Sequence, residues 1–497
     1  MPRASLNHYY QPTVLSIRKH ASSDVPPDTE PRAPSEDATA VIFIDPEKEK
    51  ATVRKFDRYV LPQFVIIQIL SYLDRTNIGN ARIFGFEEDL NFKGNDFANL
   101  TSLFYVTYVI FEIPWVLAVK RYGANSVIAI AIILWSIVVI STGFIHSYTH
   151  AVVLRLILGF TEAGIFPALS FLISTIYPRG SQAKRIAVLY GSTALAGAFG
   201  GLIAYAIQMM GDRLGIAAWR WLFIIEGAIS IVFGLACWAT LPRSSEEAWF
   251  LKEDEKRLMK DRRARDIAYT GSDEFSWSYV WMAFTDTMVW AAGLSLFCAG
   301  VPLFGFGTFL PTIIKGLGFE SLQVNYLTIP VYITGCIILA IVTFISDRLQ
   351  KRAAVAVLVP LIVIVGYAIP IGTSVAGAGF FAMFLCSGVY TYNTLLVTWV
   401  SNNIKPDHKR SAALPFFVSI ANISGVVSGQ VYPTHTAPRY ILGNAVSLSM
   451  EFMAGCGIVV IYFILRRRNQ IKDKQRADGI TDNGDKSDKA LDFEYIL

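Results

Sequence analysis

Two ionisable residues, Asp74 and Arg75, interrupt an otherwise apolar stretch near residue 70. The apolar run from 59 to 73 holds about fifteen residues, too few to cross about 30 Å of hydrocarbon at 1.5 Å per helical residue. A membrane-spanning helix must therefore continue through this pair. An aspartate and an arginine within a membrane could carry a proton and bind an anion, respectively.

A second pair of charges, Arg155 and Glu162, interrupts the apolar stretch from 151 to 177. The seven-residue spacing places both on one face of a helix, about 10.5 Å apart along its axis. A guanidinium binds a carboxylate bidentately and stays charged, whereas a carboxyl group can take up and release a proton. Because charges in a membrane are costly, they are functional candidates by default.

Three further polar residues lie in apolar helical stretches. Tyr108 and Glu112 are four residues apart and share one helix face, and Asn422 needs a hydrogen-bond partner in its apolar run. Glu112 precedes Pro114, so it could instead bond backbone groups that the proline frees. The four charges of the two pairs could likewise form ion pairs that only hold helices together, but four exceed what packing requires.

The composition identifies the elements that position these residues. The chain has 497 residues, 53% hydrophobic and 17% charged, with a mean hydropathy of +0.43, which is typical of a membrane protein. Segments long and apolar enough to span a bilayer number twelve, and we predict an all-α protein. The expected spans are 57–80, 97–119, 125–146, 151–177, 186–210, 219–241, 288–312, 324–346, 353–372, 376–400, 412–434 and 441–465.

The charge distribution divides the chain into five expected parts. They are a disordered N-terminal tail (1–56), a six-helix half (57–241), a charged central loop (242–287), a second six-helix half (288–465) and a C-terminal tail (466–497). Lys and Arg are concentrated in the even-numbered connections, the central stretch and the start of the C-terminal tail. The positive-inside rule therefore predicts that both termini are cytoplasmic. Two equivalent halves predict a substrate site between them near the midplane.

Several classes of function are excluded by the sequence. The basic residues are scattered between apolar segments, so the net charge of +5 does not indicate nucleic-acid binding. Motifs for phosphate loops, zinc proteases or nucleophile elbows are absent from the sequence, and its five cysteines lack metal-site spacing. We therefore expect no enzymatic activity, no cofactor and no metal.

The longest motifs resemble those of a transporter family. YLDRTNIGNAR, FYVTYVIFEIP followed by KRYG, RLILGFTEAGIFPALSFLISTIYPRGSQAKR, WRWLFIIEGAISIVFGLACWATLP and FLPTIIKGLGF occur in order between residues 57 and 468. They are similar to the major facilitator superfamily, specifically the anion/cation symporter family and its fungal allantoate permease branch, of nicotinate and pantothenate type. The resemblance implies the major facilitator fold and secondary active transport by alternating access.

The resemblance also implies roles for the residues singled out above. Asp74 and Glu162 match positions that couple transport to protons, and Arg75 and Arg155 match positions that capture an anionic substrate. Two more positions match the family's substrate-site residues, Tyr108 and Asn422.

The combined prediction is proton-coupled uptake of a small organic anion, such as a vitamin acid or ureide. The expected partners are the anion, protons and the lipid bilayer, and the expected form is a monomer in the plasma membrane. Two alternatives remain at this stage. The first is an exporter of a metabolite or drug, and the second is a nutrient sensor that binds without transporting. Aromatic side chains at Phe304, Phe306, Tyr392 and Trp399 either select an aromatic anion or only pack.

Overall fold

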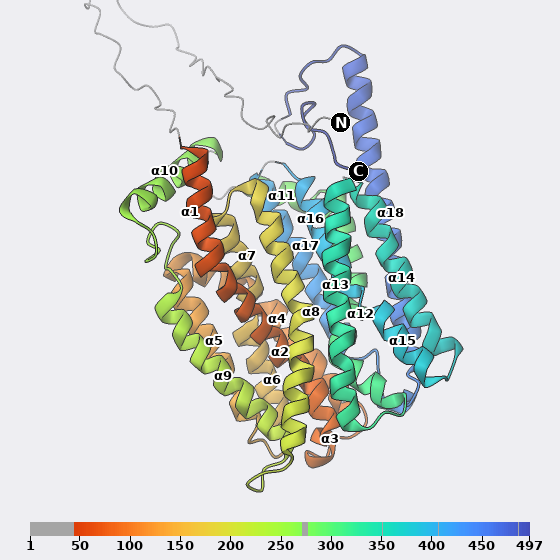
Figure 1. Ribbon diagram of the computed structural model, residues 1–497. Coiled ribbons are helices and arrows are strands. Elements are labelled where there is room, and N and C mark those ends of the chain that lie inside the picture. The colour runs from red at the N-terminus through yellow and green to blue at the C-terminus, as the bar shows by residue number, and fades with distance from the viewer. Residues whose placement is uncertain (1–43, 271–276, 350, 406, 486) are drawn as a thin grey trace, which may run out of the picture. The chain divides into compact units, whose positions relative to one another are not determined.

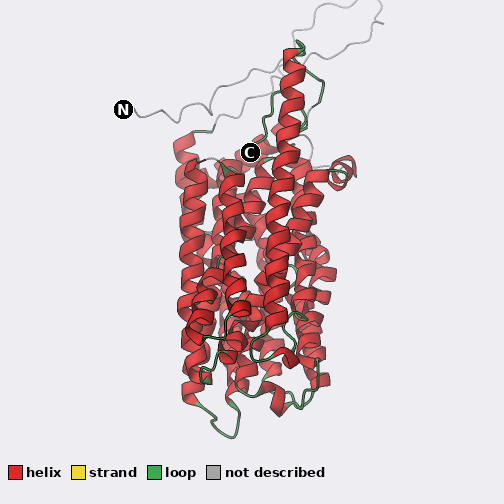
Figure 2. Ribbon diagram, turned by 90° about the vertical axis from the view of Figure 1, so that its right-hand side faces the viewer, coloured by secondary structure: helices red, strands yellow, loops and turns green. Residues whose placement is uncertain are grey.

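The computed structural model describes residues 44–270, 277–349, 351–405, 407–485 and 487–497. Within these residues the regular structure is helical, and the only β-bridge is isolated between Arg213 and Ile216. Figure 2 shows helices running side by side along the long axis of the bundle. Backbone groups in lipid must be satisfied within the chain, and helices achieve this within a single segment. The all-α prediction is confirmed.

The helices of the first half begin with α1 (Pro46–Tyr59) and α2 (Leu61–Ile83), followed by a short turn of helix, α3 (Phe86–Asp89). The remaining helices of this half are α4 (Asp96–Tyr122), α5 (Ala124–Thr142), α6 (Tyr148–Glu162), α7 (Ile165–Ile176), α8 (Arg179–Met210) and α9 (Ala218–Thr240). The fourth expected span is divided between α6 and α7. Its break lies at Gly164, where a side chain would collide with Trp115 of α4.

The second half follows the same plan. Its helices are α12 (Thr287–Gly316), α13 (Ser321–Leu349), α14 (Arg352–Gly372), α15 (Ala376–Cys386), α16 (Val389–Asn402), α17 (Asp407–Ser428) and α18 (Ile441–Ala477), with a 3-10 turn at Thr434–Thr436. The tenth expected span is divided between α15 and α16. Ten described spans are apolar and long enough to cross a membrane; α2, with its charges, and the short apolar part of α17 are the exceptions.

The segment expected to be a tail up to residue 56 is already helical from Pro46 onward. Asp45 caps α1 by accepting a hydrogen bond from the Glu47 amide, and proline occupies the first helical position. Phe56 of α1 is fully buried. The helix therefore packs through an apolar face, although the charged composition of this segment had indicated a disordered tail. Residues 1–43 of the expected tail lie outside the described residues.

The expected central loop contains two helices, α10 (Glu253–Thr270) and α11 (Trp277–Phe284). In α10 the Lys256–Glu253 pair spans 2.7 Å, and Arg262 forms a 3.2 Å ion pair with Glu49 of α1. The high charge of this stretch suggested a loop, but charges of both signs at helical spacing can stabilise a helix. Figure 1 shows α10 and α11 at the same end of the bundle as the end of α18. We call this the basic end.

The C-terminal segment also differs from a free tail, because it packs against the basic end of the second half. Lys409 at the start of α17 pairs with Asp286 at 2.5 Å and with Asp488 at 2.7 Å. Arg468 contacts the same two carboxylates, and the Tyr495 hydroxyl donates to Asp488 at 2.8 Å. We call these five residues the basic-end network.

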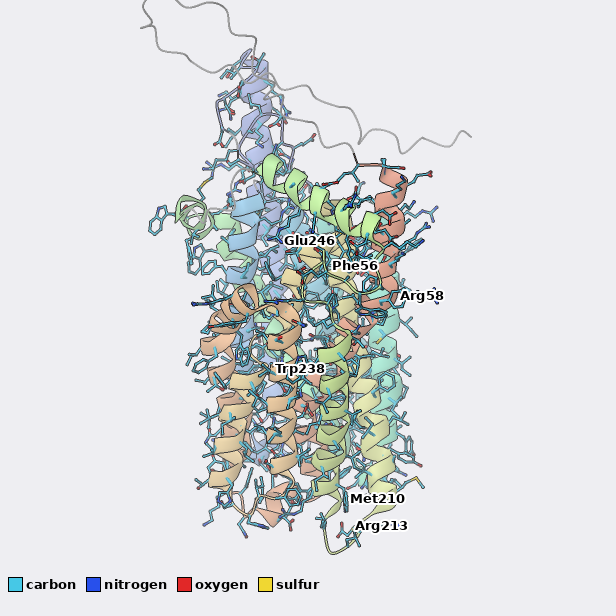
Figure 3. The ribbon with its side chains drawn as sticks, turned by 90° about the vertical axis from the view of Figure 1, so that its left-hand side faces the viewer. Phe56, Arg58, Met210, Arg213, Trp238 and Glu246 are labelled. Carbon is cyan, nitrogen blue, oxygen red and sulfur yellow. The ribbon has the colours of Figure 1, made fainter. Side chains whose placement is uncertain are left out.

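The two halves contact each other closely toward the opposite end, which carries α3 and the connection after Met210. Figure 3 places Met210 and Arg213 there, while Phe56 and Glu246 lie toward the basic end. Gln430 of the second half donates to Asn99 of the first at 3.1 Å, and the Arg82 guanidinium donates to Thr434 at 3.0 Å. These contacts join the halves on the side opposite the basic end.

Close approach between the halves depends on glycine. The Gly79 position in α2 lies against the backbone carbonyl of Thr308 in α12, and Gly201 in α8 lies against Thr328 and Asn325 in α13. A side-chain carbon at either glycine would collide with these neighbours. Small residues of this kind let helix backbones approach closely in membranes.

Candidate functional site

The four predicted charged residues are brought together in the middle of the first half. Asp74 and Arg75 lie within α2, and Arg155 and Glu162 lie on α6. All four are buried: Asp74 is 1% exposed and Glu162 is 0% exposed. The periodicity argument therefore located a genuine cluster, to which we refer as the charge cluster.

One ion pair within the charge cluster joins the two helices. Arg75 Nη2 lies 3.2 Å from Glu162 Oε2, and the Ser71 hydroxyl donates to the same carboxylate oxygen at 3.4 Å. The second oxygen of Glu162 and the Nε of Arg75 have no hydrogen-bond partner. A buried pair with unsatisfied atoms is costly to maintain. It is thus suited to rearrange when a proton or an anion arrives.

Aromatic rings of α4 surround the Arg75 guanidinium. The guanidinium carbon lies 4.7 Å from the Tyr108 ring centroid, 5.3 Å from that of Phe104 and 6.0 Å from that of Tyr105. Ring faces attract a cation while excluding water. Tyr108 is therefore adjacent to Arg75, as its predicted role requires, and Tyr105 is a neighbour that sequence reasoning did not single out.

Arg155 differs from Arg75 because no carboxylate of the described residues lies within ion-pair distance of it. Its side chain is buried, 5% exposed, and it experiences the longer-range attraction of Glu162 and Asp74. A buried guanidinium has five N–H donors and a strong requirement for acceptors. Arg155 is therefore the guanidinium of the charge cluster whose charge is not paired within the described part of the chain.

Asp74 is a second unpaired member of the charge cluster. Neither of its oxygens has a hydrogen-bond partner among the described residues. The Trp135 indole N–H of α5, also without a bonded partner, interacts with Asp74 from beyond hydrogen-bond distance. A buried carboxylate without hydrogen-bond donors or a paired cation is costly to keep in an apolar interior.

Asn422 lies at the contact between the halves, outside the Arg75–Glu162 pair. Its amide donates to Glu112 Oε2 of α4 at 3.2 Å. Three residues further along α17, Gly425 lies against the Tyr105 ring, so α17 contacts the aromatic lining of Arg75. The structure thus gives Asn422 and Glu112 a shared role as an interhalf hydrogen bond.

The second half faces the charge cluster with aromatic and hydroxyl groups. The Tyr72 hydroxyl of α2 lies 3.5 Å from the Tyr390 hydroxyl of α16, and Phe306 and Tyr332 pack around Tyr390. Phe304 packs on Tyr105 with ring centroids 4.9 Å apart. Tyrosines offer hydrogen bonds and apolar faces together, which suits a ring-bearing ligand.

Two of the aromatic residues considered above are packing residues. The Tyr392 hydroxyl donates to the Ala454 carbonyl at 2.8 Å, within the second half. The Trp399 indole donates to the Ile496 carbonyl at 2.8 Å, which fixes the C-terminal segment. Neither contact belongs to the interface between the halves.

Sequence reasoning missed two buried acids. Glu226 in α9 is 2% exposed and Glu451 in α18 is 0% exposed, and all four of their carboxylate oxygens lack partners. Each is the single charge in an apolar stretch of its helix, 221–240 in α9 and 441–465 in α18, so the rule that singled out Glu162 could have found both. Groups of His, Cys, Asp and Glu suited to a metal ion are absent from the described part of the chain.

Comparison with known proteins identifies the family to which this site belongs. The family model described as Major Facilitator Superfamily matches residues 64–429. This range covers most of the chain and includes all members of the charge cluster. The chain belongs to the major facilitator superfamily. It is therefore a multi-pass membrane transporter and not an enzyme, and the fold predicted from its motifs is confirmed.

Fungal members of the superfamily are similar to this chain over most of its length. An uncharacterized transporter of Schizosaccharomyces pombe is 40% identical over 462 residues, covering 92% of each chain. The high-affinity nicotinic acid transporter of Saccharomyces cerevisiae is 31% identical over 456 residues, covering 90% of this chain and 85% of that one. These relatives agree with the fungal nicotinate-type branch that the motifs indicated.

Solved structures of distant facilitators share the fold. A bacterial homolog of the human lysosomal transporter Spinster, in an inward-facing and occupied conformation, superposes with a TM-score of 0.61 at 15% identity, covering 83% of this chain and 97% of that one. The D-xylose-proton symporter gives a TM-score of 0.61 at 13% identity, covering 80% and 97%. At these identities the likeness concerns the fold of this facilitator alone.

Proposed function

We propose that this facilitator imports a small organic monocarboxylate together with protons across the plasma membrane, as a monomer. The observation that carries the proposal is the buried Arg155 guanidinium, which has no ion-pair partner among the residues that the structure describes and lies near Glu162 and Asp74. Such a site is suited to one carboxylate and one or more protons. The relative that is named a nicotinic acid transporter supports a pyridine carboxylate as the first substrate to test.

The Arg75–Glu162 ion pair links proton and substrate binding in this proposal. A proton on Glu162 removes the negative charge that holds Arg75, so Arg75 can then join Arg155 in binding the substrate carboxylate. Without the proton, Arg75 remains paired with Glu162. Substrate affinity therefore depends on protonation, and substrate binding in turn favours protonation by the same factor.

Alternating access would carry the loaded site from one side to the other. Gln430 and Asn99, like Arg82 and Thr434, join the halves at the end opposite the basic end. If the basic end is cytoplasmic, as the basic residues in the connections predict, these contacts close the external side. Separation of the same pairs would admit substrate from outside.

The test is uptake by cells that express the protein. Radiolabelled nicotinate, allantoate, pantothenate and biotin are supplied at acidic and neutral external pH, with and without a protonophore. We expect one anion to accumulate, more strongly at acidic pH, and the protonophore to abolish its accumulation. No uptake of any of the four, together with reduced retention of a preloaded anion, would favour export. A fluorescently tagged chain seen only at the vacuole would contradict the plasma-membrane assignment.

A further inference from the structure

Glu226 is a buried acid for which the mechanism above has no role. It lies in α9, on a turn where Gly227 packs against Ser136 and Ile140 of α5. The side chain is 2% exposed, and neither carboxylate oxygen has a hydrogen-bond partner among the described residues. A structural acid would be expected to have such a partner, because an unpaired charge in an apolar interior is strongly unfavourable.

Asp74 is the charged group whose electrostatic effect reaches Glu226. Helices α2 and α9 pack against each other, and each carries one of these two buried carboxyls. All four of their oxygens are buried and unpartnered. Two buried carboxylates without partners on packed helices cannot both be ionised without a large cost, so we expect at least one of the two to carry a proton.

Among the described residues no second charged group acts on Glu226; Ser230, four residues further along α9, is buried and likewise has no hydrogen-bond partner. Helix α5 carries no charged residue, and its polar groups here are Trp135 and Ser136; the basic residues of α8 lie in its first two turns, at the basic end. On α6, the Arg155 guanidinium attracts Asp74, whereas Glu162 repels it. The cation that can change the state of the acid pair is therefore Arg155, acting through Asp74.

This arrangement connects the acid pair to substrate binding. While Arg155 is unpaired, its positive charge favours ionised Asp74 and leaves the proton to Glu226. When a substrate carboxylate neutralises Arg155, Asp74 loses that support and the pair gains affinity for a further proton. Releasing the substrate reverses the change.

We propose that Glu226 is a second proton-carrying residue of the transport cycle, acting as a pair with Asp74. The inference rests on the proposed function and adds a proton site separate from Glu162. Its consequence is a larger number of protons carried with each anion. Each proton carried with the anion multiplies the accumulation ratio at equilibrium by about tenfold per unit of pH gradient.

The test uses the purified full chain in liposomes with labelled nicotinate. Wild-type accumulation driven by a one-unit pH gradient is measured beside counterflow exchange, which requires no net proton movement. We expect Glu226→Gln to lower the accumulation ratio by about tenfold while exchange changes less than about twofold. Glu451→Gln is the matched control, because Glu451 is also buried and unpartnered, but no charged group of the described residues acts on it. It should preserve both activities.

The outcomes separate the inference from the function on which it rests. Absence of gradient-driven accumulation in the wild type would contradict proton-coupled nicotinate uptake itself. Normal accumulation in the wild type and an unchanged ratio in Glu226→Gln would overturn the inference alone.

If Glu226→Gln loses exchange because it does not fold, infrared spectroscopy provides a second test of the inference. The wild type at neutral pH should show a carboxylic C=O stretching band from the acid pair, and Asp74→Asn should shift that band. A spectrum without the band, or a band that Asp74→Asn leaves unmoved, would overturn the inference.

Discussion

The two halves of this transporter share a helical plan but differ in their buried charge. The helices of the first half bury Asp74, Arg75, Glu112, Arg155, Glu162 and Glu226. In the described helices of the second half, Glu451 is the buried acid, and the buried Lys409 and Lys472 lie toward the basic end. The second half contributes tyrosines and phenylalanines toward the interface. Its densest charge lies in the basic-end network.

This difference indicates a division of labour. A charge cluster within one half can keep its internal distances while the halves move against each other, because helices of one half move together in rocking models of alternating access. The partner half then needs only to supply shape and hydrogen bonds. If this is correct, equivalent substitutions in the two halves should have unequal effects.

The largest expected effect compares two buried glutamates. Glu162→Gln should abolish gradient-driven accumulation, because the Arg75 ion pair loses its titratable partner. Glu451→Gln in the second half should leave accumulation within about twofold of the wild type, since no charged group lies near it. Uptake assays with and without a protonophore measure both. Equal losses in the two variants would contradict the division of labour.

The next effect concerns the substrate anion. Arg155→Lys keeps the positive charge but loses the planar pair of donors that binds a carboxylate bidentately. We expect the apparent KM for the transported anion to rise by about tenfold or more, corresponding to one charge-assisted hydrogen bond of about 1.5–3 kcal/mol. Concentration-dependent exchange in liposomes gives the KM. An unchanged KM would place the carboxylate elsewhere.

A smaller effect should follow from the contact between the halves. Gly201→Ala introduces a methyl group against Thr328 and Asn325 of α13, whereas Gly191→Ala on the same helix meets only Leu339 at 3.7 Å. We expect several-fold slower transport for Gly201→Ala and little change for Gly191→Ala, because only the former opposes closure of the halves. Initial uptake rates normalised to surface expression provide the comparison. Equal rates would argue against close packing at Gly201 during the cycle.

The smallest expected effect on transport lies in the basic-end network. Lys409→Met leaves Arg468 as the cation shared by Asp286 and Asp488 and should lower stability by about 3 kcal/mol, with near-normal transport in the folded fraction. Thermal denaturation in detergent measures the loss. A variant as stable as the wild type would show that the network is not structural.

The same network gives the wild type an acid dependence. Burial by itself would raise the pKa of Asp286, but Lys409 and Arg468 outweigh it and hold that pKa below its usual value. Stability from this group is therefore complete above its unfolded pKa of about 3.9 and is lost as pH falls through the lower folded value. Denaturation temperatures measured across acidic pH test this sign. A gain in stability over that range would contradict it.

Several site residues could be predicted because membrane burial makes charge conspicuous. Asp74, Arg75, Arg155 and Glu162 stood out in apolar sequence, and the structure gathers them. Glu226 was open to the same argument, but its pairing with Asp74 was not, since the two residues are far apart in the chain. Helices α1 and α10 were concealed by their charged composition, although Asp45 and Pro46 provide a helix-start signal.

The sequence by itself determined the transporter class, the spans and most members of the charge cluster, because hydrocarbon penalises charge and unpaired backbone regardless of tertiary contacts. Only the tertiary structure decided which charges are paired. It paired Arg75 with Glu162, left Arg155 without an ion-pair partner in the described part of the chain, and packed the helix that carries Glu226 against the helix that carries Asp74. The physical reason is that a hydrophobic pattern fixes which face of a helix is buried, whereas helix packing fixes which neighbour that face meets.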